Sequence, residues 1–138
     1  MGYYKLLEHT ADLGIKVWGE SIRDLFIHSA CVMYDMIADI KSIHPIVFFN
    51  VKAEGLDKDE LLKNWLSELL CYFHLKDILL GRFDIKNISD NSIVSLAWGE
   101  KIDRKRHILK REIKAVTYHS LKIAKKGNKF QTDIIFDV

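Results

Sequence analysis

Two stretches of the chain repeat apolar residues at three- and four-residue steps, which is the spacing of one face of a helix. The first covers residues 21–37 and opens with Ser21 and Asp24, a pair typical of a helix start. The second opens with Asp57 and Glu60, and its apolar face comprises Leu61, Leu62, Trp65, Leu66, Leu69, Leu70 and Phe73. The pattern therefore predicts two amphipathic helices.

The other apolar stretches are short and rich in β-branched and aromatic residues, as strands are. In the second half of the chain, turn-forming residues at 89–91 and 125–128 separate two pairs of such stretches, and Gly127 is suited to a positive φ. The predicted strands are 3–7, 13–18, 46–53, 82–88, 92–98, 112–124 and 129–137. We expect an α+β fold in which the two helices pack on mainly antiparallel β-sheet.

The composition adds a single-domain organisation to this picture. The chain has 138 residues, one proline and no Gly/Ser-rich linker or repeat, so we expect one domain over residues 1–138. A hydrophobic content of 49% can build a sizeable core, and a net charge of +2 does not demand a nucleic acid or a membrane as partner. The absence of a signal peptide or a long apolar run, and two cysteines in apolar helical stretches, suggest a cytoplasmic protein.

A carboxylate interrupts an apolar, strand-like stretch near each end of the chain. These carboxylates are Asp12 and Asp137, and the last residue, Val138, is expected to add its own terminal carboxylate. If the fold joins the two ends, the three groups bring hard oxygens to one point, where a cation such as calcium, magnesium or manganese would offset their charge. The alternative is two unrelated surface aspartates at a frayed terminus.

Three further residues are candidate neighbours of this site. His9 lies three residues before Asp12 and can be a ligand, a general base or a hydrogen-bonded structural histidine. Lys114 lies in an apolar stretch predicted to be a strand, where an inward-pointing lysine would have to pair with Asp12 or Asp137. A strand with one solvated face is the explanation that the sequence alone favours for Lys114. His119 is the other histidine that could join a metal-dependent reaction at this site.

Residues 101–111 are strongly basic against a nearly neutral background. Arg104, Lys105, Arg106 and His107 lie at the centre of this stretch, which can meet RNA phosphates, an acidic protein surface or only solvent. No aromatic residue interleaves the stretch, which argues against binding to single strands. No phosphate-binding glycine loop, metal-protease motif or nucleophile elbow occurs, so no catalytic residue is assigned.

Four blocks of the sequence are distinctive in combination. The first is Glu8-His9-Thr10-Ala11-Asp12-Leu13-Gly14-Ile15, and the second covers residues 59–70 of the second predicted helix. The third combines Gly99-Glu100 and Arg106-His107 with residues 112–119, which contain Lys-Ala-Val-Thr-Tyr-His. The fourth is Ile134-Ile135-Phe136-Asp137-Val138. In order and spacing, and over nearly the whole chain, these blocks resemble the archease family.

The resemblance implies a small α+β protein that is not itself a catalyst. Archeases assist the RtcB-type RNA ligase in tRNA splicing and RNA repair, promoting its guanylylation and multiple turnover. The partner implied is therefore that ligase, with tRNA reached indirectly through it and no membrane involved. The resemblance also implies a bound divalent cation, calcium first and manganese or magnesium as alternatives, with ligands that match Asp12, Asp137 and Val138.

Two other functions remain open at this point. One is a metal-dependent hydrolase that uses Asp12 and Asp137 with His9 or His119. The other is a small RNA-binding module that works through the basic stretch. The lack of a nucleophile–base motif argues against the first, and the small net charge argues against the second.

Overall fold

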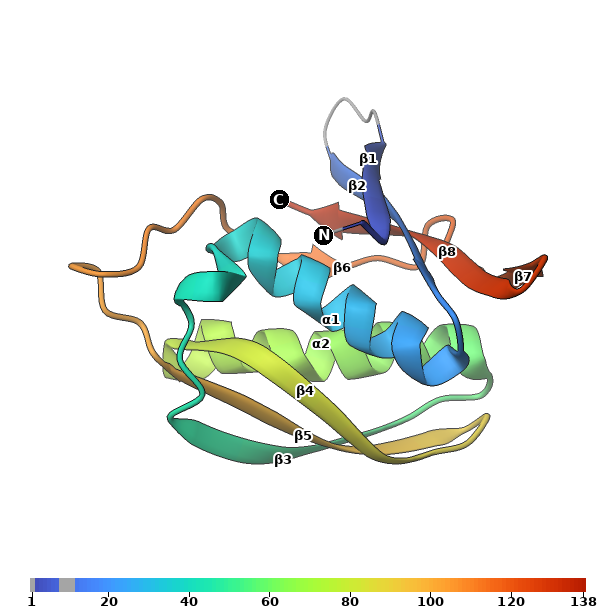
Figure 1. Ribbon diagram of the computed structural model, residues 1–138, viewed down its shortest axis with the longest axis horizontal. Helices are drawn as coiled ribbons and strands as arrows, with labels where there is room; N and C mark the ends of the chain where they lie inside the picture. The colour runs from blue at the N-terminus through green and yellow to red at the C-terminus, as the bar shows by residue number, and fades with distance from the viewer. Residues whose placement is uncertain (1, 8–11) are drawn as a thin grey trace.

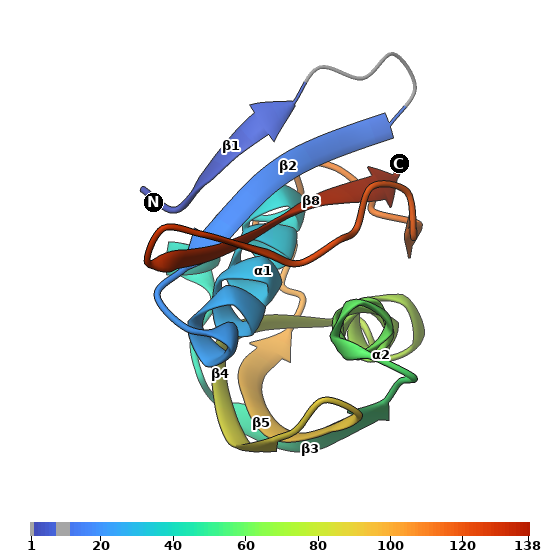
Figure 2. The ribbon, with the colours of Figure 1, turned by 90° about the vertical axis from the view of Figure 1, so that its right-hand side faces the viewer.

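Two antiparallel sheets enclose the two helices in a sheet–helix–sheet arrangement (Figures 1 and 2). The computed structural model describes residues 2–7 and 12–138. The elements are β1 (Tyr4–Leu7), β2 (Asp12–Gly19), α1 (Ile22–Ile37), the 3-10 turn η1 (Ile40–Ser42), β3 (Val47–Glu54), α2 (Lys58–Lys76), β4 (Ile78–Ile88), β5 (Ser92–Lys101), β6 (Ala115–Val116), β7 (Ala124–Lys126) and β8 (Lys129–Asp137).

The first sheet joins the two ends of the chain. Its strand order is β1-β2-β8-β6, and β7 pairs with β8 outside this path. The second sheet has the order β3-β5-β4, and both sheets are antiparallel throughout. α1 packs between β2 and β4, and α2 packs on β3, β4 and β6. The predicted α+β fold with two helices and antiparallel sheet is confirmed.

Both predicted helix starts are also confirmed. The Ser21 hydroxyl accepts a hydrogen bond from the Asp24 N–H at 3.1 Å, and the Asp57 carboxylate accepts one from the Glu60 N–H at 2.8 Å. Each cap satisfies a backbone donor that the first turn of a helix leaves unpaired. α1 and α2 begin at the residues that follow these caps, Ile22 and Lys58.

The prediction of a strand over residues 112–124 is wrong. Two separate short strands pair with β8 instead. These are β6 at Ala115–Val116 and β7 at Ala124–Lys126, and β7 forms with β8 the hairpin that turns at Gly127 with φ +62°. Between these strands the chain leaves the sheet edge, and Ser120 adopts a left-handed conformation with φ +61°. Such a conformation is incompatible with a continuous strand.

β4 begins four residues earlier than predicted, at Ile78, because Ile78, Leu79 and Leu80 are all buried against the helices. A register shift between Leu80 and Arg82 lets β4 pass close to β5 at this point. A side chain at Gly99 would place its Cβ 1.9 Å from the Leu79 carbonyl oxygen, so the close approach requires glycine there.

A buried chain of hydrogen bonds links α2 to the second sheet. The indole Nε1–H of Trp65 donates to the Ser95 hydroxyl at 2.9 Å, and that hydroxyl donates to the Val51 carbonyl at 2.7 Å. Trp65 and Ser95 have no exposed surface. Of the two cysteines in apolar helical stretches, Cys31 is half-buried and packs against the core, whereas Cys71 is exposed on α2.

We predict that Ser95→Ala lowers the free energy of unfolding by about 1–3 kcal/mol, the usual cost of leaving a buried polar group unpaired. The variant leaves both the Trp65 N–H and the Val51 carbonyl without this partner. Ser67→Ala is the matched control, because the Ser67 hydroxyl bonds only to the Lys63 carbonyl of its own helix. Urea unfolding of both variants measures the difference, and equal stabilities would contradict the role of this chain of bonds.

Candidate functional site

The pairing of β2 with β8 places the two predicted metal ligands directly opposite each other. Asp12 opens β2, Asp137 closes β8, and the two are Cα partners in the antiparallel register. Side chains of such partners leave the same face of a sheet with Cβ atoms about 4.5–5.5 Å apart. Figure 2 shows the C-terminus beside the first residues of β2. The fold therefore joins two carboxylates from opposite ends of the sequence.

The same face of the sheet carries a contrasting pair four residues further along β2. Lys16 and Asp133 are also direct partners, and their side chains form an ion pair at 2.8 Å. Asp12 and Asp137 also lie directly opposite each other, but both carry negative charge. Their repulsion destabilises the pairing of the two strands unless a cation offsets it. Within residues 2–7 and 12–138, no lysine or arginine side chain forms an ion pair with either aspartate.

These donors fit a hard divalent cation. Carboxylate oxygens are the preferred ligands of calcium and magnesium, and both ions commonly complete their shells with carbonyl oxygens and water. Val138 follows Asp137 directly in the chain and is 40% exposed. In the described part of the chain, no group of three or more histidine, cysteine, aspartate or glutamate side chains is placed to hold a metal. A cation here would therefore need backbone, terminal or water oxygens in addition to the two aspartates.

The three candidate neighbours differ in how they relate to the pair. The Lys114 N–H donates to the Asp137 carbonyl at 2.7 Å, so its backbone adjoins the site. Lys114 itself is exposed and lines a shallow groove with residues of α2, and it makes no ion pair with either aspartate. His119 lies in an exposed turn after β6, and His9 lies outside the described residues.

The basic stretch is folded around one carboxylate, that of Glu100 at the end of β5. The Arg106 guanidinium pairs with Glu100, and the His107 Nε2–H donates to the same carboxylate at 3.0 Å. The His107 Nδ1 accepts the Asp103 N–H at 2.9 Å, which leaves Nε2 as the protonated nitrogen. His107 is only 3% exposed, so its imidazole holds this loop together from inside.

Burial alone would raise the pKa of Glu100, but its hydrogen bonds outweigh that effect. Arg106, the His44 N–H at 2.6 Å and His107 all donate to the carboxylate, and the positive charge of Arg106 adds to them. Together they lower the pKa of Glu100 to about 2. The carboxylate is therefore ionised at neutral pH and anchors both the basic stretch and the segment before β3.

Several other cations of the basic stretch also have structural partners. The Arg111 guanidinium donates to the Met36 carbonyl at 3.0 Å, Lys101 donates to the Lys76 carbonyl at 3.0 Å, and Lys110 lies 3.9 Å from Asp35. Arg104 and Lys105 are exposed at the tip of the loop. The positive charge presented to solvent is therefore smaller than the sequence suggests and is concentrated at this tip.

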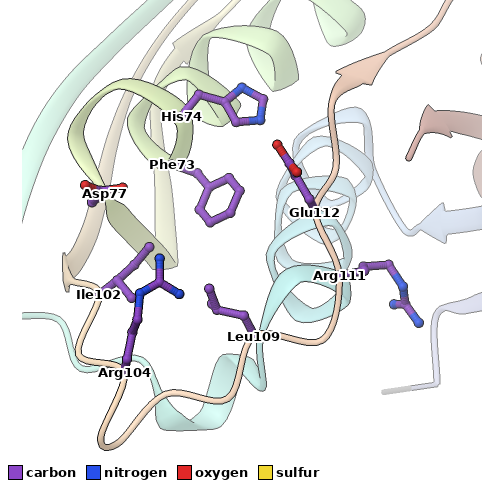
Figure 3. Close-up of a pocket in the computed structure, with 8 residues that line it drawn as sticks. All are labelled: Phe73, His74, Asp77, Ile102, Arg104, Leu109, Arg111 and Glu112. Atoms are coloured by element: carbon purple, nitrogen blue, oxygen red, sulfur yellow. The ribbon is translucent and has the colours of Figure 1, made fainter.

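A hollow of about 400 Å³ lies between the end of α2 and the basic stretch (Figure 3). Its lining residues are Phe73, His74, Asp77, Ile102, Arg104, Leu109, Arg111 and Glu112. The Phe73 ring lies at its centre, whereas the Arg111 side chain points away from it (Figure 3). The His74 imidazole donates to the Ile113 carbonyl at 2.8 Å. Sequence reasoning did not identify this hollow, because its residues come from two segments that only the fold joins.

The family is decided by comparison with known proteins. The sequence profile of the archease protein family (MTH1598/TM1083) matches residues 4–138. This chain belongs to the archease family. The archease of Sulfurisphaera tokodaii is 32% identical over 140 residues, with both chains fully covered. That of Methanosarcina barkeri is 34% identical over 139 residues, covering 98% of this chain and 95% of the relative.

Solved structures agree with this assignment. The solution structure of protein 1598 of Methanobacterium thermoautotrophicum matches with a TM-score of 0.81 and 25% identity, and both chains are fully covered. A crystal structure of an archease from Thermotoga maritima matches with a TM-score of 0.66 at 22% identity, covering 97% of this chain and 96% of the other. Both likenesses support the α+β arrangement described above. No described helix is long and apolar enough to cross a membrane.

We predict that the stabilising effect of Glu100 depends on pH. Its pKa is lowered to about 2 in the folded protein from an ordinary value near 4.5, so the unfolded state binds more protons between these values. The stabilisation is therefore complete above about pH 4.5 and is lost as the pH falls through the folded-state pKa. Glu100→Gln should lower the Tm by several degrees at pH 7 and by much less near pH 2.5.

Glu54→Gln is the control, because Glu54 is exposed on β3 and forms no ion pair. Its Tm difference from the wild type should be small at every pH. Thermal unfolding followed by circular dichroism across this pH range makes the comparison. A Glu100→Gln difference that stays constant with pH would show that the hydrogen bonds do not set the ionisation of this carboxylate.

Proposed function

We propose that this protein is an accessory protein of an RtcB-type RNA ligase and is not itself an enzyme. In this role it promotes guanylylation of the ligase and lets it turn over repeatedly in tRNA splicing and RNA repair. Membership of the archease family supports the proposal. The observation that carries it furthest is the direct pairing of Asp12 with Asp137. The ligase is the immediate partner, tRNA is reached through it, and the setting is the cytoplasm.

Within this proposal, Asp12, Asp137 and an oxygen of Val138 hold one divalent cation. Calcium is the first choice, because its flexible coordination tolerates carboxylate, carbonyl and water oxygens in irregular geometry. Magnesium and manganese are the alternatives. When bound, the cation would supply positive charge at the surface. The chain's own contribution is to hold two carboxylates at a common point through the β2–β8 register.

The position of the site supports a role in contact with a partner. Asp137 is exposed at the end of β8, and Asp12 is half-buried at the start of β2. Neither residue belongs to the hydrophobic core, so little stability depends on their side chains. The two carboxylates repel each other across the strand pair and contribute nothing to the core. A functional role therefore explains them better than a role in folding.

We predict that Asp12→Asn and Asp137→Asn each weaken calcium binding by at least about tenfold, since the attraction between close charges near a surface is on the order of a few kcal/mol. Isothermal titration calorimetry with calcium measures the effect. Asp84→Asn is the matched control, because Asp84 is an exposed strand aspartate in the other sheet. Unchanged calcium affinity in both variants would show that Asp12 and Asp137 do not hold the cation.

We predict that Asp12→Ala reduces ligase stimulation to the unassisted level while the protein stays folded. The assay uses a catalytic amount of RtcB-type ligase and counts RNA joining events per ligase molecule, with labelled guanylylated ligase measured in parallel. Asp84→Ala is the control variant. Full multiple turnover with a variant that has lost calcium binding would show that the cation is only structural.

The same assay tests the alternative of a metal-dependent hydrolase. Hydrolysis of RNA or a phosphate ester by the protein alone, abolished by Asp137→Asn, would support that alternative against the accessory role. Lys114→Ala is expected to alter calcium affinity or ligase stimulation with little effect on folding, because the Lys114 backbone adjoins Asp137. If Lys114→Ala binds calcium and stimulates the ligase as the wild type does, Lys114 has no role at the site beyond its backbone contact.

A further inference from the structure

No helix of the described residues covers one face of the β3-β5-β4 sheet. Both helices lie on the other side of this sheet, toward β1, β2 and β8 (Figures 1 and 2). Along β3, Phe49, Val51 and Ala53 are buried or half-buried against α2, whereas the alternate positions from Phe48 to Glu54 are exposed. This outer face is therefore open to a ligand.

Three side chains form a row across the outer face, one from each strand. Phe48 on β3 and Arg82 on β4 are both direct partners of Trp98 on β5. The Phe48 and Trp98 ring centroids are 6.5 Å apart, and the Arg82 guanidinium lies 4.7 Å from the Trp98 ring centroid. We call Phe48, Trp98 and Arg82 the aromatic platform. The Phe48 side chain is 60% exposed, which is unusual because phenylalanine is usually buried.

The basic stretch is anchored at the end of this platform. Glu100 follows Trp98 by two residues on the same face of β5, and Glu100 pairs with Arg106. Arg106 also donates to the Ser42 carbonyl at 2.7 Å, which holds the loop against the segment before β3. The exposed Arg104 and Lys105 belong to the same loop. The fold thus supplies the aromatic side chains that the basic stretch lacks in the sequence.

The charges of the outer face favour an anionic ligand. Lys52, Lys86 and Arg82 are exposed on β3 and β4 and outnumber the exposed carboxylates of Glu54 and Asp84. Glu100 is already neutralised by Arg106. The loop tip adds the exposed Lys105, whereas Arg104 lines the hollow at the end of α2 (Figure 3).

We propose that the outer face of the β3-β5-β4 sheet binds single-stranded RNA. Unpaired bases stack on Phe48 and Trp98, and the phosphates run past Arg82 toward Lys105. Exposed aromatic rings on an open sheet, flanked by arginine and lysine, are the usual means of holding single strands. RNA is the ligand because its loops and ends present unpaired bases, which stacking requires. This proposal does not depend on the ligase, since binding can be measured with the protein alone.

The first test is fluorescence anisotropy of the full chain with a labelled single-stranded RNA of about 12 nucleotides, a length within the range that one such surface covers. Phe48→Ala and Trp98→Ala should each weaken binding about tenfold, the typical effect of removing one stacking partner. Tyr118→Ala is the matched control: Tyr118 is 47% exposed and has Lys63 5.3 Å from its ring centroid, but lies outside the platform. Its affinity should equal that of the wild type.

A second set of variants separates stacking from apolar contact and from misfolding. Phe48→Leu keeps an apolar side chain but removes the ring, so it should weaken RNA binding as Phe48→Ala does. Trp98→Phe keeps a ring in the half-buried position and should retain most of the affinity. Reversing the charge of Lys105 should reduce the salt dependence of binding, because fewer phosphate contacts release counterions.

Three results would overturn the proposal. The first is the absence of RNA binding at about 50 mM salt, where phosphate contacts are strong. The second is equal affinity for DNA of the same sequence or for duplex RNA, which would remove the assignment to single-stranded RNA. The third is full RNA affinity in Phe48→Ala. That result would show that the exposed ring takes no part in RNA binding.

Discussion

The pairing of β2 with β8 is the interaction on which the candidate metal site depends. It joins eight residue pairs between strands from opposite ends of the chain, from Asp12 with Asp137 to Gly19 with Phe130. The inward residues Ile15, Val17, Ile134 and Phe136 are buried in the core, and a slip of one residue would turn them to solvent. The hydrophobic effect therefore determines this register, and the register in turn places the two carboxylates opposite each other.

A second constraint acts at the end of β5, where one carboxylate organises a whole loop. Glu100 receives hydrogen bonds from Arg106, His107 and the His44 backbone, and these bonds keep it ionised. Buried histidine and paired arginine are therefore used for folding, while only part of the positive charge of the basic stretch reaches solvent. A count of basic residues in a sequence does not make this distinction, because partners such as Glu100 are known only once the loop is folded.

The two proposed activities lie on separate sheets with the helices between them (Figure 1). The carboxylate pair belongs to the sheet that joins the chain ends, and the aromatic platform belongs to the β3-β5-β4 sheet. Substitutions at one site should therefore leave the other intact, since distant sites without shared contacts behave nearly independently. If both proposals hold, the protein contacts a ligase through one sheet and RNA through the other.

The sequence by itself determined both helices, their caps, five of the strands to within a few residues and the α+β class, because helical and strand periodicity are local properties. It also singled out Asp12 and Asp137, although not their direct pairing. It did not determine that residues 112–124 break into two short strands, since the chain leaves the sheet edge after β6 and passes through a left-handed residue at Ser120. Nor did it separate the exposed Phe48 from the half-buried Phe49, because only the packing of α2 on one face of β3 distinguishes them. The site and the platform both join residues far apart in the chain, and tertiary structure alone decides which of them meet.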